Sequence, residues 1–176
     1  MFDSDYILVG KHATFAKYLC RERGVIQEDR ANIFPTIADL MLVAPLIGVY
    51  YNRYVAERDT SSKDKSSVLL AQIASRKTKY IEVYRLVMLA NRTGDFSDKD
   101  KIDQAFRHDL DKDEDNPNME IFDAYARGGI EVLYEKFEDA ASHREDKKRF
   151  LCGIMNDFIN ELYEPVDLYN LTDEDE

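Results

Sequence analysis

The stretch FPTIADLMLVAPLIG, from Phe34 to Gly48, decides the fold. Its apolar residues keep helical spacing and occupy nearly the whole circumference rather than one stripe. A helix that is apolar all round is a buried one, so we expect this element at the centre of the core. Thr36 is placed to cap its first turn, with Asp39 favouring the free amides there. Pro45 is expected to kink the helix unless the local backbone yields.

Other stretches with helical spacing lie on both sides of this element. They are residues 11–23, 79–94, 121–137 and 144–163. Residues 6–9 favour a short strand. The sequence therefore predicts a mainly α fold, a single compact helical domain of five to seven helices. A minor two-stranded element near residues 6–9 and 53–57 is compatible with it.

Two adjacent glycines, Gly128 and Gly129, interrupt the stretch 121–137. Each glycine inside a helix costs about 1 kcal/mol relative to alanine. A chain that keeps both uses them for positive φ or for close backbone approach. We expect a helix break or sharp bend at this pair, which would pack Ile130 and Leu133 against the apolar helix.

The expected core combines residues from all of these stretches. Its members are Leu40, Val43, Ile47, Val87, Leu89, Ile121, Tyr125, Leu133, Leu151, Ile154 and Phe158. The domain is expected to span residues 1–165. Residues 166–176 form an acidic tail that is expected to be frayed.

The composition is that of a globular protein with long elements: 44% hydrophobic residues, but only 7 glycines and 4 prolines in 176 residues. Early acids and the absence of an apolar run argue against a signal peptide. The longest apolar run, 37–51, is too short to span a bilayer. Cys20 and Cys152 are far apart and are expected to be buried free thiols. These features indicate a cytoplasmic protein with no membrane partner.

Charge is divided unevenly along the chain. Residues 1–108 carry 17 basic and 14 acidic side chains, whereas residues 109–176 carry 7 basic and 21 acidic ones. A near-neutral half joined to a strongly acidic half indicates two surfaces with different partners.

One acidic segment, 109–120, invites a calcium hypothesis. Its acids alternate as in an EF-hand loop and end in Glu120. Glu114, however, occupies the position where that loop needs glycine, so a solvated acidic loop is the favoured interpretation. We expect no metal site.

No constellation of catalytic residues emerges. The histidines, His12, His108 and His143, lack metal-ligand spacing, and phosphate-binding glycine loops and nucleophile motifs are absent. The paired acids Glu131 and Glu135 are interpreted as a solvated helix face. The protein is therefore expected to have no catalytic residues, no cofactor and no enzymatic activity.

A basic segment, residues 53–92, contains nine Lys and Arg side chains and four acidic ones, interleaved with tyrosines. A solvated face is the favoured interpretation, because the net charge of −11 opposes approach to DNA. The alternative is a site for nucleic acid or a protein partner. Its candidate residues are Arg53, Arg76, Lys77, Lys79 and Arg85.

Three blocks together carry a family resemblance: FPTIADLMLVAPLIG at 34–48, YIEVYRLVMLA at 80–90 and IFDAYARGGIEVL at 121–133. The third is the most specific. In order and spacing they resemble the Dnd-system-associated proteins of the fourth type. These are bacterial proteins encoded beside the Dnd genes, which modify DNA by phosphorothioation and restrict unmodified invaders. The blocks cover roughly a third of the chain, and the family offers no catalytic motif to carry over.

The resemblance implies a non-enzymatic accessory, adaptor or regulatory subunit of an anti-phage defence system. Its expected partner is another protein of that system, a nuclease or ATPase component. Three alternatives remain: direct nucleic-acid binding through the basic segment, an acidic DNA mimic, and, as the least favoured, a metal-dependent nuclease.

Overall fold

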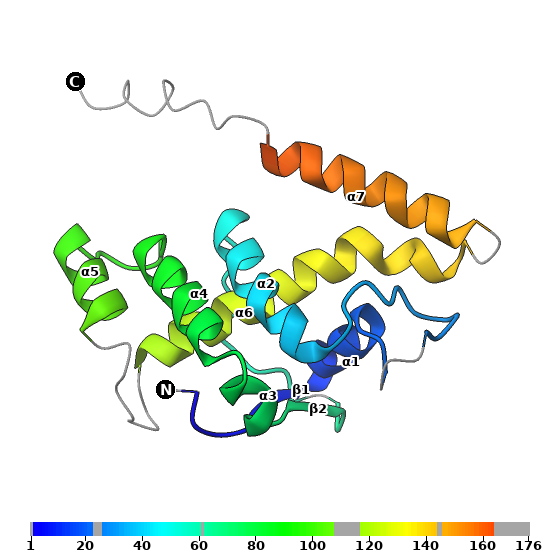
Figure 1. Cartoon of the computed structure of the whole chain (residues 1–176). Coiled ribbons are helices and arrows are strands. Elements are labelled where there is room, and N and C mark those ends of the chain that lie inside the picture. The colour runs from blue at the N-terminus through cyan, green and yellow to red at the C-terminus, as the bar shows by residue number, and fades with distance from the viewer. Residues whose placement is uncertain (1, 23–25, 61, 108–116, 144–145, 164–176) are drawn as a thin grey trace.

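Two crossing helices, α2 (Ile37–Tyr50) and α6 (Pro117–Phe137), form the centre of the molecule (Figure 1). The computed structural model describes residues 2–22, 26–60, 62–107, 117–143 and 146–163. This part contains seven α-helices, one short 3-10 helix and one two-stranded sheet, which confirms the mainly α prediction. The elements are β1 Tyr6–Val9, α1 Gly10–Leu19, α2 Ile37–Tyr50, β2 Lys65–Val68, α3 Leu70–Ala74, α4 Lys77–Leu89, α5 Asp98–Phe106, α6 Pro117–Phe137, η1 Glu138–Ala141 and α7 Lys147–Tyr163.

The α2–α6 crossing is the most extensive contact between elements in the described part. At its closest points, the backbone of one segment lies against the backbone of the other. A Cβ on Gly129 would lie 1.7 Å from the Ala44 carbonyl oxygen, and one on Gly48 would lie 2.1 Å from the Tyr125 carbonyl oxygen. A Cβ on Gly128 would lie 1.8 Å from the Arg53 carbonyl oxygen. Only glycine permits this approach at these three positions.

The predicted bend at Gly128 and Gly129 is wrong. α6 continues without interruption from Pro117 to Phe137, and neither glycine has positive φ. Both glycines are needed because a carbonyl oxygen of another segment lies close to each Cα atom. Close backbone approach was one of the two expected uses of this pair. The flanking Ile130 and Leu133 are nevertheless buried in the core, as expected.

The start of α2 confirms its predicted cap. The Thr36 hydroxyl oxygen accepts a hydrogen bond from the Asp39 backbone N–H at 3.2 Å. The Asp39 carboxylate lies 2.6 Å from the same hydroxyl. α2 then continues through Pro45 to Tyr50.

The two-stranded sheet exists, but its second strand is β2 and not residues 53–57 as predicted. β1 pairs antiparallel with β2, so that Tyr6 faces Val68 and Val9 faces Lys65. Residues 53–57 form no strand. This segment lies alongside α6 instead, where the Val55 N–H donates a hydrogen bond to the Ala124 carbonyl at 3.1 Å.

Several predicted boundaries also need correction. α1 ends at Leu19 and not at Arg23. The next residue, Cys20, forms an isolated β-bridge with Phe34. α4 ends at Leu89, before Gly94. α5 was not predicted, because its sequence is largely charged. Its start is stabilised by a capping box between Ser97 and Asp100.

Most of the predicted core is confirmed. Leu40, Ile47, Val87, Tyr125, Leu133 and Phe158 are buried. Ile121, Leu151 and Ile154 are partly buried and pack against the core. Val43 and Leu89 were wrongly placed there: each is 37% exposed, because α2 and α4 turn one stripe outward.

α7 packs on the rest of the molecule through a small set of contacts. The Phe158 ring faces those of Tyr51 and Phe137, each at a centroid distance of 6.4 Å. Glu161 lies 2.5 Å from Lys136 Nζ and accepts a hydrogen bond from the Tyr51 hydroxyl at 2.7 Å.

Some predictions fall outside the described residues. They concern residues 109–116 of the acidic segment, His108 and the tail 166–176. No helix in the described part of the chain is long and apolar enough to cross a membrane.

We expect Gly129→Ala to destabilise the fold by about 2–3 kcal/mol, because the new methyl group overlaps the Ala44 carbonyl. Helix propensity alone would have the opposite sign. The matched control is Gly153→Ala in α7, where no atom lies within 4 Å of the new Cβ. We expect it to be stabilising by about 0.5–1 kcal/mol. Thermal unfolding of both variants measures the difference, and a rise in Tm for Gly129→Ala would contradict the described crossing.

The two cysteines should differ in reactivity. Both are free, but Cys20 is buried while Cys152 is exposed, which corrects the expectation that both are buried. Burial and the nearby Asp39 raise the pKa of the Cys20 thiol to about 12. A maleimide should therefore label Cys152 alone in the native protein and both thiols in denaturant. Mass spectrometry of the labelled protein checks this, and native labelling at Cys20 would contradict it.

Candidate functional site

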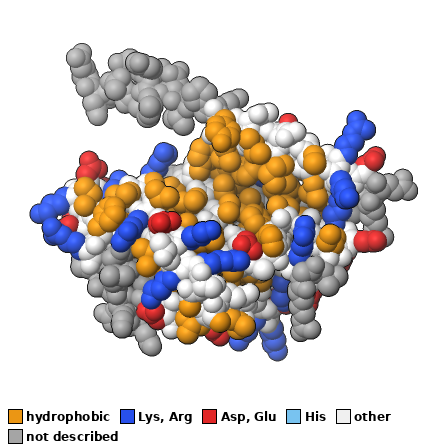
Figure 2. All heavy atoms as spheres, viewed as in Figure 1, with side chains coloured by type: hydrophobic (Ala, Val, Ile, Leu, Met, Phe, Trp, Pro, Cys, Tyr) orange, Lys and Arg blue, Asp and Glu red, His pale blue; other side chains and the backbone are white. Residues whose placement is uncertain are grey.

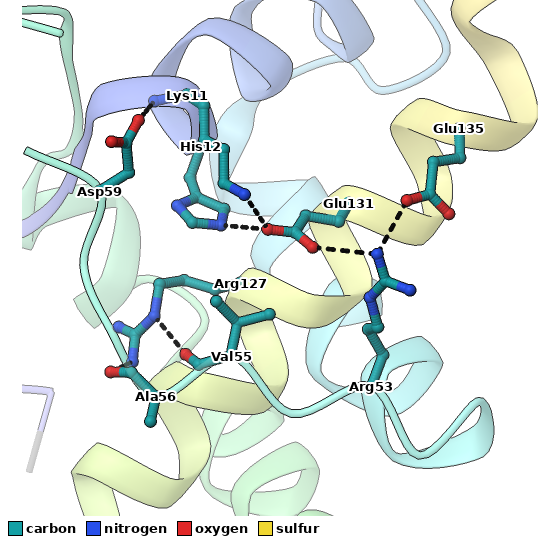
Figure 3. A network of polar contacts seen from close by, with 9 residues as sticks. All are labelled: Lys11, His12, Arg53, Val55, Ala56, Asp59, Arg127, Glu131 and Glu135. Atoms are coloured by element: carbon teal, nitrogen blue, oxygen red, sulfur yellow. Dashed lines mark hydrogen bonds and ion pairs between the residues drawn. The ribbon is translucent and has the colours of Figure 1, made fainter. Parts of the chain in front are cut away.

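A buried carboxylate, Glu131 of α6, lies at the centre of a cluster of charged side chains (Figure 3). Its Oε1 atom lies 2.8 Å from Lys11 Nζ and 3.0 Å from His12 Nε2. Its Oε2 atom lies 3.3 Å from Arg53 Nη2, and the same guanidinium reaches Glu135 at 2.9 Å. The side chain of Glu131 is only 8% exposed, so its charge is compensated by partners rather than by water.

Local backbone geometry brings these partners to Glu131. Gly10 has a φ of 63° and leads from β1 directly into α1, so that Lys11 and His12 fall in the first turn of the helix. The Asp59 carboxylate accepts a hydrogen bond from the Lys11 N–H at 2.7 Å at that helix start. Arg53 follows α2, where its N–H donates to the Gly48 carbonyl at 2.8 Å.

Arg127, one helical turn before Glu131, extends the cluster. Its guanidinium donates to the Val55 carbonyl at 2.8 Å and to the Ala56 carbonyl at 2.9 Å. The side chain is buried, and it holds the segment after α2 against α6. Figure 3 shows that residues from α1, α6 and this segment converge on one place.

The environment favours one protonation state of the central pair. Burial alone would raise the pKa of Glu131, but hydrogen bonds from Lys11 and His12 hold it below its ordinary value. Burial lowers the pKa of His12 despite its contact with Glu131. At neutral pH the pair is therefore a carboxylate beside a neutral imidazole.

The interpretation of Glu131 and Glu135 as a solvated helix face is wrong for Glu131, which is buried. Only Glu135 is exposed, at 56% of its side chain. A signal was present in the sequence: Glu131 is the single acid within the run 124–134, where nearly every other residue is apolar or glycine. An acid in such a run is buried with partners unless the helix itself is exposed.

The five predicted basic residues are not gathered into one site. Arg53 belongs to the buried cluster, whereas the other four lie on α4 or just before it. Arg76 pairs with Asp39 at 2.9 Å and Lys77 with Asp3 at 2.7 Å. Lys79 is exposed, and the Arg85 guanidinium lies 5.2 Å from the centre of the Phe106 ring.

Among the described residues, no group of three or more His, Cys, Asp or Glu side chains could hold a metal ion. The acids of the 109–120 segment that precede α6 are not among those residues.

Exposed apolar side chains gather on another part of the molecule, which we call the apolar surface. Figure 2 shows them over α2 and beneath α7, with more over α4 and α5. Isolated exposed apolar residues are ordinary, whereas a gathering of them marks an interaction site. The exposed large apolar side chains of these four helices are Val43, Tyr50, Leu86, Leu89, Ile102, Phe106, Ile159 and Tyr163.

Comparison with known proteins identifies a family for this chain. The family model described as DNA sulphur modification system-associated protein 4 matches residues 22–157. The chain belongs to this family. The match confirms the resemblance seen in the three sequence blocks, and it contains α2, α6 and Glu131. No curated protein and no solved structure matches the chain.

The family's name indicates association with a DNA sulphur modification system. It names neither a reaction nor a ligand. What this chain contributes to the system has therefore to be argued from its surfaces.

The buried cluster should make stability pH-dependent. His12 is neutral in the fold, while in the unfolded chain it takes up a proton near its ordinary pKa of 6.5. Stability therefore falls as the pH decreases below about 7.5, and it continues to fall until His12 is protonated in the folded state as well. We expect His12→Gln, which retains a donor for Glu131, to flatten this part of the profile in thermal unfolding. His143→Gln is the control, because His143 is exposed. Equal slopes in the His12 variant and the native protein would contradict the assignment.

A second decline should follow at lower pH. The folded-state pKa of Glu131 lies below its ordinary value, so its contribution is lost only as pH falls below about 4.5. Glu131→Gln should remove that decline and destabilise the protein at neutral pH, because Lys11 and Arg53 lose their buried partner. An unchanged Tm for Glu131→Gln at neutral pH would show that the cluster contributes no stability.

Proposed function

We propose that this protein is a non-enzymatic accessory subunit that binds another protein of a DNA sulphur modification system acting in anti-phage defence. The apolar surface carries the proposal. It exposes apolar side chains such as Leu86, Ile102 and Phe106, each more than half exposed. Covering side chains of this size releases roughly 25 cal/mol for each Å² of apolar area removed from water.

The buried cluster supports an architectural role for its charges. Both carboxylate oxygens of Glu131 are engaged by cationic or imidazole groups, and Arg127 is engaged by two backbone carbonyls. These contacts hold α1 and the segment after α2 on α6. A shape-stable body of this kind suits a subunit that presents a preformed surface to its partner.

A protein partner is favoured over DNA as the main ligand. Three of the five candidate basic residues, Arg53, Arg76 and Lys77, pair with acids of the same chain. These acids already neutralise part of the positive charge, which weakens its attraction for a phosphate group. The net charge of −11 further opposes approach to DNA. Direct nucleic-acid binding through residues 53–92 stays a prediction, which a gel shift at low salt tests.

The test is co-expression of this protein, tagged, with the proteins encoded in its DNA sulphur modification system. We expect one of them to co-purify in a fixed ratio. Leu86→Glu and Ile102→Glu should each reduce its recovery at least about tenfold, because a buried unpaired carboxylate in an interface costs more than 1.4 kcal/mol. Both side chains are about half exposed, so the fold should tolerate the change.

The matched control is Ile26→Glu. Ile26 is 63% exposed and lies outside the apolar surface, so it introduces the same charge without touching the proposed interface. Recovery with this variant should equal that of the native protein. The proposal is wrong if no system protein co-purifies, or if all three variants lose the partner equally.

A further inference from the structure

A glycine lies in the exposed middle of α7 without a structural reason inside the described part of the chain. No atom lies within 4 Å of the position that a Cβ on Gly153 would occupy. Glycine is a poor helix former, because it gives up more backbone freedom on folding than other residues. At Gly48, Gly128 and Gly129 a neighbouring backbone segment requires it. At Gly153 the close neighbour has still to be found.

Opposite charges flank this glycine at equal distances. Arg149 lies four residues before Gly153 and Asp157 four residues after it, and all three are exposed. Residues four apart along a helix are neighbours on its surface, so the three form one continuous row, which we call the α7 ridge. Within the described part of the chain, neither charged side chain has an ion-pair or hydrogen-bond partner.

The order of the charges is unfavourable for α7 by itself. The helix begins with Lys147, Lys148 and Arg149, its first turn contains no acid, and its last turn contains no base. The partial positive charge of a helix N-terminus favours acids there, and the C-terminus favours bases. A partner that presents the reverse order of charge would compensate this arrangement. A second α7 running antiparallel presents that order at the same spacing.

A two-fold axis beside Gly153 brings the matching charges together. Positions 149 and 157 are equally far from Gly153, so each Arg149 would face Asp157 of the other copy. Packing of the rows of residues four apart is the commonest crossing of two helices. The missing side chain lets the two helix axes approach closely at the crossing, as the glycines of α2 and α6 do within one chain. Two-fold dimers repeat every contact, which gives two ion pairs.

We propose that the α7 ridge is the docking surface for a second copy of this chain, with the two α7 helices antiparallel and crossing at Gly153. Figure 1 shows α7 at the edge of the molecule, where a second copy has access to it. The dimer goes beyond the proposed function, because the ridge contains neither Leu86 nor Ile102. It is measured on the purified protein alone, so its failure is distinguishable from failure to bind a system protein.

The first test is sedimentation equilibrium of the purified protein from micromolar to millimolar concentration. We expect the mass to rise with concentration from that of one chain to that of two. At physiological salt, charges separated by more than about 8 Å are largely screened, so the net charge of −11 opposes this association only weakly. A short bismaleimide should join two chains through Cys152, which is exposed and adjacent to Gly153.

Charge reversal tests the pairing itself. Arg149→Asp and Asp157→Arg should each weaken the dimer at least about tenfold, because two attractive pairs become two repulsive ones. An equal mixture of the two variants should associate again, since each chain then meets the opposite charges on the other. Lys148→Asp is the matched control. It makes the same change of charge in the same turn, but Lys148 lies about 100° around the helix from Arg149.

Gly153→Leu tests the close crossing. The new side chain has open space in a single chain, so the helix content seen by circular dichroism should be retained. The same side chain fills the crossing, so the mass should stay that of one chain.

The proposal is overturned if the native protein stays monomeric at millimolar concentration. It is also overturned if the mixture of charge variants associates no better than either variant alone, or if Gly153→Leu leaves a dimer intact, because the contact would then lie on another surface.

Discussion

The backbone contact between α2 and α6 is the constraint on which the rest of the structure depends. Three glycines let a carbonyl oxygen of a facing segment come close to their Cα atoms, so the backbones of α2 and α6 lie in direct contact at the crossing. Contacts of this kind gain dispersion energy along the whole crossing and weak Cα–H···O bonds within it. They also tolerate no change of register, since sliding either helix by one residue would bring a Cβ into a carbonyl.

The position of the buried ion cluster follows from this contact. The Gly48 carbonyl fixes Arg53 at the end of α2, and α6 places Glu131 opposite it. Ion pairs buried in this way contribute little net stability, because desolvation cancels most of the attraction. Their effect is on specificity: other placements of α1 or of the segment after α2 would leave Glu131 and Arg127 buried without partners.

Much of the fold was predictable from local patterns. The buried character of α2, its Thr36 cap and the mainly α class all follow from periodicity and capping chemistry. The uninterrupted course of α6 could not be predicted. A glycine pair is equally compatible with a bend in the helix and with close packing against another backbone segment, and the sequence does not distinguish the two. The strand partner of β1 was missed for a similar reason, since pairing depends on which segment the tertiary structure brings alongside.

The candidate site was less predictable than the fold. His12 and Glu131 are 119 residues apart in sequence and meet only because α1 lies on α6. The exposed stripe of α2 is likewise visible only once its other faces are covered. One helix crossing therefore supports two features of different chemistry: α6 carries the buried ion cluster around Glu131, and α2 carries part of the apolar surface. Because both rest on the same backbone contact, a substitution that disturbs the crossing must weaken both together, whereas a change confined to one of them affects that one alone.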